Sequence, residues 1–289
     1  MDWGRTKFIL ILTFLILNLI FAFQLWVVPS FFDSDMFISR QQIDARVADL
    51  RSKNISISAQ IPRRLAHRQM LTLAPPDFES RDIVHSIFGS FVQSRRTRYD
   101  LYTSSQGEIR VYRDGRVEYA VAPRETTETT PASALETART FMEKGPGLPD
   151  DARHLRTFET EPGIYLVEFG QYWQRKHVPV SYLRFLVDGQ GVLNMEYYWV
   201  QIGELVGENV LVIPSTGALM VAADYLPGRS EITDLYLSWF SRPLMAEEWR
   251  VPAVWVVETE SEVLYINAYS GDLEDRYLFQ AGNILEDVE

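Results

Sequence analysis

Hydrophobic residues form one long unbroken run near the start of the chain and shorter periodic patterns after it. The run from Phe8 to Val28 covers 21 residues without a charged side chain. A helix rises about 1.5 Å per residue, so this run spans roughly 31 Å and matches a hydrocarbon core of about 30 Å. A cleaved signal peptide has an apolar region of only about 7–15 residues and ends in small side chains, whereas this run ends in bulky ones. The pattern predicts an uncleaved transmembrane anchor.

The charges beside this run predict its orientation. Arg5 and Lys7 precede it, and the first charged residues after it are acidic. Positively charged flanks stay in the cytoplasm. We therefore expect residues 1–7 to form a cytoplasmic tip, residues 8–28 a single-pass anchor in the cell membrane, and the C-terminal part to be extracellular.

Five side chains in the anchor are candidates for contacts with a partner helix. Lipid tails are as apolar as Leu, so packing and buried amides select a helix partner. Asn18 is the strongest polar group in mid-helix, Phe14 and Phe21 lie at neighbouring turns, and Thr13 and Gln24 share another face. The alternative is that a lone amide is simply tolerated in the helix.

After the anchor, helical and alternating patterns are mixed, which predicts an α+β fold. The expected helices are Arg40–Ser52 behind a capping box at Ser39–Gln42, a segment from near Asp77 to Gly89, one capped by Thr130 that starts at Pro131 and stops at Gly145, and one from Ser215 to Pro227. The expected strands are Ile55–Ser58, Ile164–Tyr172, Asp234–Trp239, Pro252–Glu258 and Val263–Tyr269. The Thr- and Glu-rich segment Ala122–Pro131 is the predicted linker.

Two hairpins have a register that the sequence predicts. Around Asp114-Gly115, a three-residue loop with a left-handed Gly115 pairs Val111 with Val117 and sets Arg110 against Glu118 on the wet face. At the second hairpin, a five-residue loop from 188 to 192 pairs Val187 with Leu193, Phe185 with Met195, Leu183 with Tyr197 and Arg184 with Glu196.

Composition and motifs argue against several functions. The net charge of −11 disfavours nucleic-acid binding. The absence of cysteine excludes disulfides, thiolate metal sites and cysteine nucleophiles. The four histidines lie far apart, and no nucleophile, phosphate-loop or dinucleotide motif occurs. We expect no enzyme activity, no cofactor and no metal.

Two basic clusters and three aromatic clusters stand out. The basic ones are Arg63, Arg64, His67, Arg68 and Arg95, Arg96, Arg98. A solvated face is the first interpretation of each, and a docking patch for an acidic partner is the second. The aromatic ones are Tyr172-Trp173, Tyr197-Tyr198-Trp199 and Tyr236 to Phe240. Core packing explains such clusters, and a groove for wall glycan is the alternative.

Both ends of the chain resemble one bacterial family. Residues 1–19, MDWGRTKFILILTFLILNL, resemble the start of the YycI family; residues 265–273, YINAYSGDL, are similar to its C-terminal strand and turn, and Pro252–Val256 to the strand before them. The resemblance implies a Gram-positive, non-enzymatic membrane protein that works with YycH beside the WalK (YycG) sensor histidine kinase. It also implies two extracellular α+β units with antiparallel sheets, placed here at residues 29–125 and 126–289.

Three hypotheses follow. The first is a single-pass membrane regulator that modulates an essential cell-wall two-component sensor kinase through transmembrane helix contacts, together with a YycH-like partner. The second is an exported, membrane-tethered binding module for wall polymer or a protease. The third is a wall hydrolase without a recognisable motif. The anchor's amide and the N-terminal resemblance favour the first.

Overall fold

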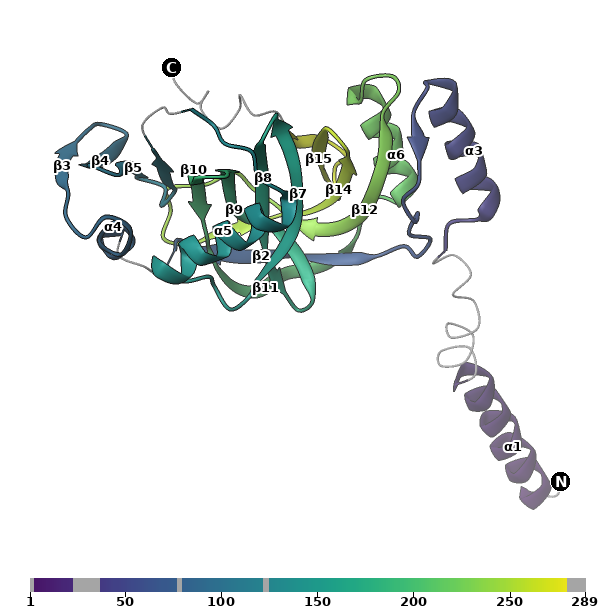
Figure 1. Cartoon of the computed structure of the whole chain (residues 1–289). Coiled ribbons are helices and arrows are strands. Elements are labelled where there is room, and N and C mark those ends of the chain that lie inside the picture. Colours follow the sequence, from purple (N-terminus) through teal and green to yellow (C-terminus); the bar gives the residue numbers. More distant parts are fainter. Residues whose placement is uncertain (1–2, 23–36, 77–79, 122–124, 280–289) are drawn as a thin grey trace.

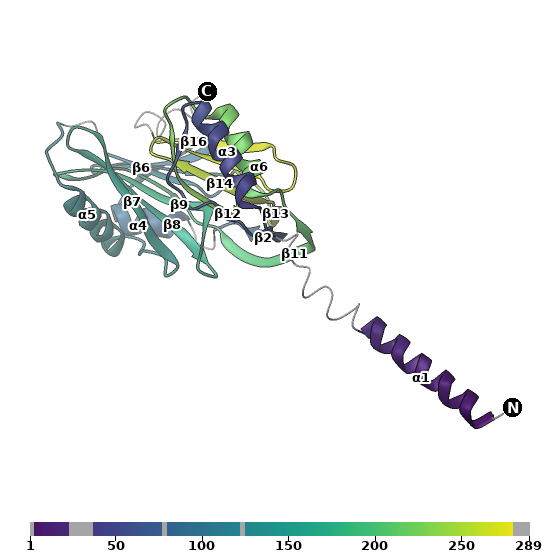
Figure 2. The ribbon, with the colours of Figure 1, turned by 90° about the vertical axis from the view of Figure 1, so that its right-hand side faces the viewer.

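The computed structural model describes residues 3–22, 37–76, 80–121 and 125–279. Helix α1 (Trp3–Ala22) stands apart from the rest of the described chain (Figures 1 and 2), and its apolar side chains are exposed. Within the described residues, none of the helices meets the length and apolarity needed for a membrane crossing. The end of the predicted anchor, residues 23–28, lies outside the described residues.

Within the described residues the folded part has four helices: α3 (Arg40–Ser52), α4 (Ser80–Phe88), α5 (Pro131–Lys144) and α6 (Ser215–Tyr225). The predicted capping box is confirmed, because Ser39 accepts from the backbone of Gln42 and the Gln42 side chain accepts from that of Ser39. The predicted cap Thr130 accepts from the Ser133 nitrogen at 3.2 Å. Local capping therefore sets where α3 and α5 begin.

Sixteen strands in the described residues form three sheets. The eight-stranded sheet has the order β3 (Val92–Arg95), β4 (Tyr99–Ser104), β5 (Gly107–Tyr112), β6 (Val117–Ala120), β10 (Gly191–Tyr198), β9 (Lys176–Asp188), β8 (Ile164–Trp173), β7 (Ala152–Glu161). The five-stranded sheet runs β1 (Ser56–Ile57), β12 (Glu231–Trp239), β14 (Ala253–Thr259), β15 (Glu262–Asn267), β16 (Leu273–Leu278). The three-stranded sheet is β11 (Gln201–Leu211), β2 (His67–Ala74), β13 (Trp249–Val251).

The α+β class with antiparallel sheets agrees with the sequence prediction, apart from one strand pair: β1 runs parallel to β12. The buried residues Ala134, Ala138 and Met142 pack α5 against the eight-stranded sheet. Helices α3 and α6 lie side by side over the end of the five-stranded sheet (Figure 1). Strands β6 and β10 pair across the predicted boundary at 125/126, so segments from both sides share one sheet.

The first hairpin has the predicted register. Val111 pairs with Val117, Arg110 with Glu118, and Gly115 has a φ of 91°. The backbone positions therefore follow the pattern that puts the valines in the core and the charged pair on the other face.

The second hairpin corrects a prediction. Val187 pairs with Val192, not with Leu193, and the loop has two residues rather than five. The reason is the Asp188 carboxylate, which accepts from the backbone nitrogens two and three residues later at 2.9 and 3.0 Å and closes a tight turn opposite Gly191. A bulge at Leu193 then restores the remaining predicted pairs: Phe185 with Met195, Arg184 with Glu196, and Leu183 with Tyr197.

The first described residues after α1 attach to the segment before β2. Phe37 and Arg64 form an isolated antiparallel bridge. The Ile38 nitrogen donates to the Arg63 carbonyl at 2.7 Å. Phe37 and Ile38 are therefore fixed to this segment by backbone contacts.

Candidate functional site

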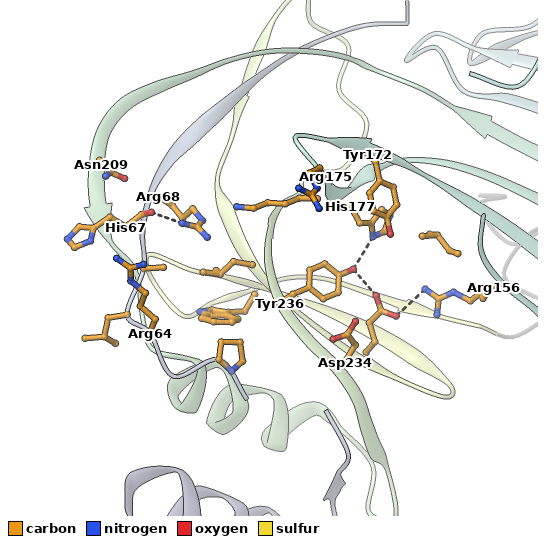
Figure 3. Close-up of a pocket in the computed structure, with 18 residues that line it drawn as sticks. Arg64, His67, Arg68, Arg156, Tyr172, Arg175, His177, Asn209, Asp234 and Tyr236 are labelled. Atoms are coloured by element: carbon orange, nitrogen blue, oxygen red, sulfur yellow. Dashed lines mark hydrogen bonds and ion pairs between the residues drawn. The ribbon is translucent and has the colours of Figure 1, made fainter. Parts of the chain in front are cut away.

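A cleft of about 1030 Å³ opens where the three sheets meet. Its walls come from the segment before β2, from β2 itself, from β7, from the β8–β9 turn, and from β12 and β14 (Figure 3). These segments are far apart in sequence, so the tertiary fold creates the cleft. Its volume lies at the upper end of typical ligand pockets, which are roughly 300–1,000 Å³.

Positive charge dominates one side of the cleft. Arg64, Arg68, Arg175 and Lys176 all line it. Within the described part of the chain, none of the four has a carboxylate oxygen within 4.0 Å. Burial lowers the pKa of Arg68, and burial together with the Arg68 charge lowers the pKa of Lys176. The fold therefore brings like charges together without neutralising them.

A strained turn carries one of these cations. Trp173 pairs with Lys176, which leaves Gln174 and Arg175 as a two-residue hairpin loop. Both loop residues have positive φ, 47° and 67°. Such loops favour Gly or Asn, because a longer side chain is disfavoured at positive φ. The chain keeps an arginine where glycine would fit with less strain.

A chain of polar contacts also lines the cleft. Tyr236 donates to Glu258 at 2.7 Å, and its oxygen lies 3.0 Å from His177 Nδ1 (Figure 3). A hydroxyl has one proton. Because Tyr236 donates that proton to the Glu258 carboxylate, its oxygen accepts a hydrogen bond from His177 Nδ1. Burial lowers the pKa of His177 to about 4, which keeps the ring neutral at neutral pH. Arg156 completes the chain with an ion pair to Glu258 at 3.3 Å.

A buried ion network continues from Arg156 into the sheet. Arg156 Nε lies 2.8 Å from Glu168, and the Glu168 carboxylate also accepts a hydrogen bond from Arg184 Nε at 2.9 Å. Arg184 in turn lies 3.6 Å from Glu196 and packs against the ring of Tyr277, 3.8 Å from its centroid. Burial raises the pKa of Glu196 to about 7 although Arg184 opposes the shift. The cleft thus borders a network of buried ion pairs.

The structure separates the predicted partner-binding residues from the cleft. Thr13, Phe14, Asn18 and Phe21 lie on α1, and Gln24 lies outside the described residues. Asn18 Nδ2 donates to the Phe14 carbonyl one turn earlier, at 2.8 Å. The spacing of residues 14, 18 and 21 places them on one face of the helix.

The predicted clusters divide between the cleft and other surfaces. Arg64, His67 and Arg68 of the first basic cluster line the cleft, whereas no member of the second does. Tyr172 and Tyr236 also line it, while Tyr197, Tyr198 and Trp199 are buried in the core. No three potential metal ligands gather in the described residues.

Sequence reasoning missed Arg175, Lys176 and Glu258 as cleft residues. For the first two a signal existed, since a polar pair between two strand patterns predicts a two-residue hairpin that displays its side chains. For Glu258 none existed, because its partners come from β7 and β12.

Comparison with known proteins gives only loose relations. No family model matches the chain, and no curated protein matches it. An uncharacterized protein from Eubacterium rectale ATCC 33656, known from a crystal structure, is similar with a TM-score of 0.46 and 12% identity, over 78% of this chain and 91% of that one. The Bacillus megaterium YpeB C-terminal domain is similar with a TM-score of 0.41 and 9% identity, over 72% of this chain and 99% of that domain.

Proposed function

We propose that this protein is a non-enzymatic, single-pass membrane regulator of the YycI type. In this proposal α1 and the residues after it anchor the chain with its N-terminus in the cytoplasm. The anchor modulates a WalK (YycG)-like sensor histidine kinase through helix contacts, together with a YycH-like partner. The part from residue 37 onward is extracellular.

The observation that carries the proposal is the exposed apolar surface of α1. Phe14 is 67% exposed and Phe21 is 51% exposed. Exposed apolar surface of this extent marks a membrane or protein contact. Asn18 uses one amide hydrogen on its own helix. An amide has a second hydrogen and an accepting oxygen, which remain for a partner helix.

The test replaces the amide and keeps the anchor. Asn18→Leu raises the hydropathy of the helix, so membrane insertion should be unchanged. We expect association with the kinase or with the YycH-like protein to weaken by about 1 kcal/mol, roughly fivefold. The measurement is a two-hybrid or crosslinking assay in membranes, read beside a reporter that the kinase controls.

A matched control moves the amide instead of deleting it. Asn18→Ile combined with Ile16→Asn keeps the composition of the helix and turns the amide by about 200°. It should fail as the single variant does. If both variants associate and regulate normally, the amide has no role and the helix-contact mechanism is wrong.

The cleft favours a second candidate, an exported binding module for which the helix is only a tether. Replacing residues 8–28 by polyleucine separates the two. Under the first proposal regulation is lost, and deleting the extracellular part harms regulation less. Normal regulation with polyleucine and loss on deletion of the extracellular part would favour the second.

A further inference from the structure

We propose that the cleft binds a phosphate-bearing ligand, held by Arg64, Arg68, Arg175 and Lys176. This inference is independent of how α1 acts. It rests on the cavity, on the charge that the fold leaves uncompensated inside it, and on the turn that presents Arg175.

The first step is the charge of the cleft. The chain has a net charge of −11, so carboxylates are abundant for pairing with surface cations. Some cations use them, as in the pairs Arg113–Asp100 at 3.1 Å and Lys53–Asp224 at 2.9 Å. The four cations of the cleft have no such ion pair in the described residues, and Arg64, Arg175 and Lys176 are exposed to solvent. Water therefore screens part of their mutual repulsion, and an anion bound among them would gain from all four charges.

The second step is an unused donor. The Nε of Arg68 is buried and has no hydrogen-bond partner in the described part of the protein, while its NH1 donates to the His67 carbonyl at 2.9 Å. A buried donor without an acceptor destabilises the folded protein. An oxygen-rich ligand in the cleft would supply the missing acceptor.

The third step is the turn. Arg175 sits at a φ of 67°, where glycine is less strained. Backbone strain of this kind clusters at ligand sites, among other places. Here the strained residue lines the cleft (Figure 3).

The ligand class follows from the number of donors. Three guanidinium groups and one ammonium offer more N–H donors than the two oxygens of a single carboxylate accept. A phosphate presents more oxygens and up to two negative charges, which suits mixed Arg and Lys sites. Asp234 and Glu258 also line the cleft. Glu258 accepts a hydrogen bond from Tyr236 and forms an ion pair with Arg156. The phosphate therefore belongs on the β2 and β8–β9 side.

The rest of the cleft suits an organic group attached to the phosphate. Leu65, Leu155 and Leu237 line it together with Tyr172 and Tyr236. Apolar and aromatic walls with a few polar groups are typical of small-molecule sites. The volume exceeds what a phosphate alone fills.

The test uses the full chain in a non-ionic detergent, with inorganic pyrophosphate as the probe and citrate as a carboxylate probe, in isothermal titration calorimetry. We expect saturable binding of pyrophosphate that weakens as salt rises, because part of the attraction is screened. Citrate should bind at least tenfold more weakly. Equal or tighter citrate binding would overturn the phosphate assignment.

Two variants locate the site. Arg175→Gln with Lys176→Gln should weaken pyrophosphate binding at least tenfold. The matched control, Arg95→Gln with Arg96→Gln, removes the same charge from residues that do not line the cleft and should change affinity by less than twofold. Equal losses in the two variants, or no saturable binding by the unmodified protein, would overturn the proposal.

A third variant guards against loss of folding. Arg175→Gly removes the charge and relaxes the turn. Its unfolding temperature without ligand should equal or exceed that of the unmodified protein, while its pyrophosphate affinity falls. Full affinity in this variant would show that Arg175 is no part of the site.

Discussion

Replacing Glu168 by Gln should be among the most destabilising changes of a single charge in this protein. Glu168 is 4% exposed and lies 2.8 Å from Arg156 Nε and 2.9 Å from Arg184 Nε. The substitution keeps the shape of the side chain and leaves two largely buried guanidinium groups with one carboxylate fewer. Breaking a buried ion pair by removing one partner costs about 3–5 kcal/mol, so we expect a loss of that size in the free energy of unfolding.

The surface offers a control with a similar separation between the charged atoms. Asp224 pairs with Lys53 at 2.9 Å, but its side chain is 67% exposed. Exposed pairs contribute about 0–1 kcal/mol, so Asp224→Asn should cost less than about 1 kcal/mol. The difference between the variants isolates the effect of burial from the effect of distance.

The assay is urea unfolding followed by tryptophan fluorescence, with the unfolding slope compared between variants. It also has a pH signature. Burial alone raises the pKa of Glu168, but Arg184 and Arg156 outweigh it and hold that pKa below its ordinary value. The stabilisation by Glu168 is therefore present above the pKa of the unfolded chain and is lost as pH falls through the folded value. If Glu168→Gln costs no more than Asp224→Asn at neutral pH, the network does not stabilise the fold.

Three further predictions concern other parts of the fold. Gly170→Ala should cost roughly 1–3 kcal/mol in urea unfolding, since a Cβ there would overlap the His177 ring. Gly217→Ala, whose Cβ would make only ordinary van der Waals contacts with Pro214 and Ile213, should be neutral or stabilising. Above pH 7 the Glu196→Gln variant should be more stable than the unmodified protein by up to about 3 kcal/mol. The folded-state pKa of Glu196 is raised to about 7, so the stabilisation by the protonated acid is fully present below the unfolded pKa and is lost as pH rises through 7. Equal pH profiles of stability in the two proteins would contradict this prediction. Thr130→Ala should lower stability by about 1 kcal/mol through loss of the α5 cap, and Thr130→Ser should restore it.

Local signals predicted much of the fold. The capping box fixed the start of α3, and opposite charges on the wet face fixed the 109–121 hairpin. The prediction of a five-residue loop at 188–192 was wrong, because the periodic pattern cannot distinguish a longer loop from a tight turn followed by a bulge. In each case that succeeded, the deciding residues lie within about ten positions of one another.

Long-range pairing could not be predicted. Strand β11 is largely exposed and carries glycines, so its alternation is weak, and it is held by β2 more than a hundred residues earlier. The cleft depends on that pairing and on the meeting of β7, β12 and β14. One interpretation of the sequence made the first basic cluster, Arg63 to Arg68, a docking patch. Arg175 and Lys176 line the same cleft as this cluster only because of the tertiary fold.

The bridge between Phe37 and Arg64 has a mechanical consequence. Among the described residues after α1, Phe37 and Ile38 come first in the chain, so this bridge and the adjacent Ile38–Arg63 hydrogen bond bear a tension that acts on them from the side of α1. Arg64 also lines the cleft. The backbone of Arg63 and Arg64 therefore both holds the residues that follow the tether and forms part of the cleft wall. A pull on the tether and the binding of a ligand in the cleft would act on the same short segment.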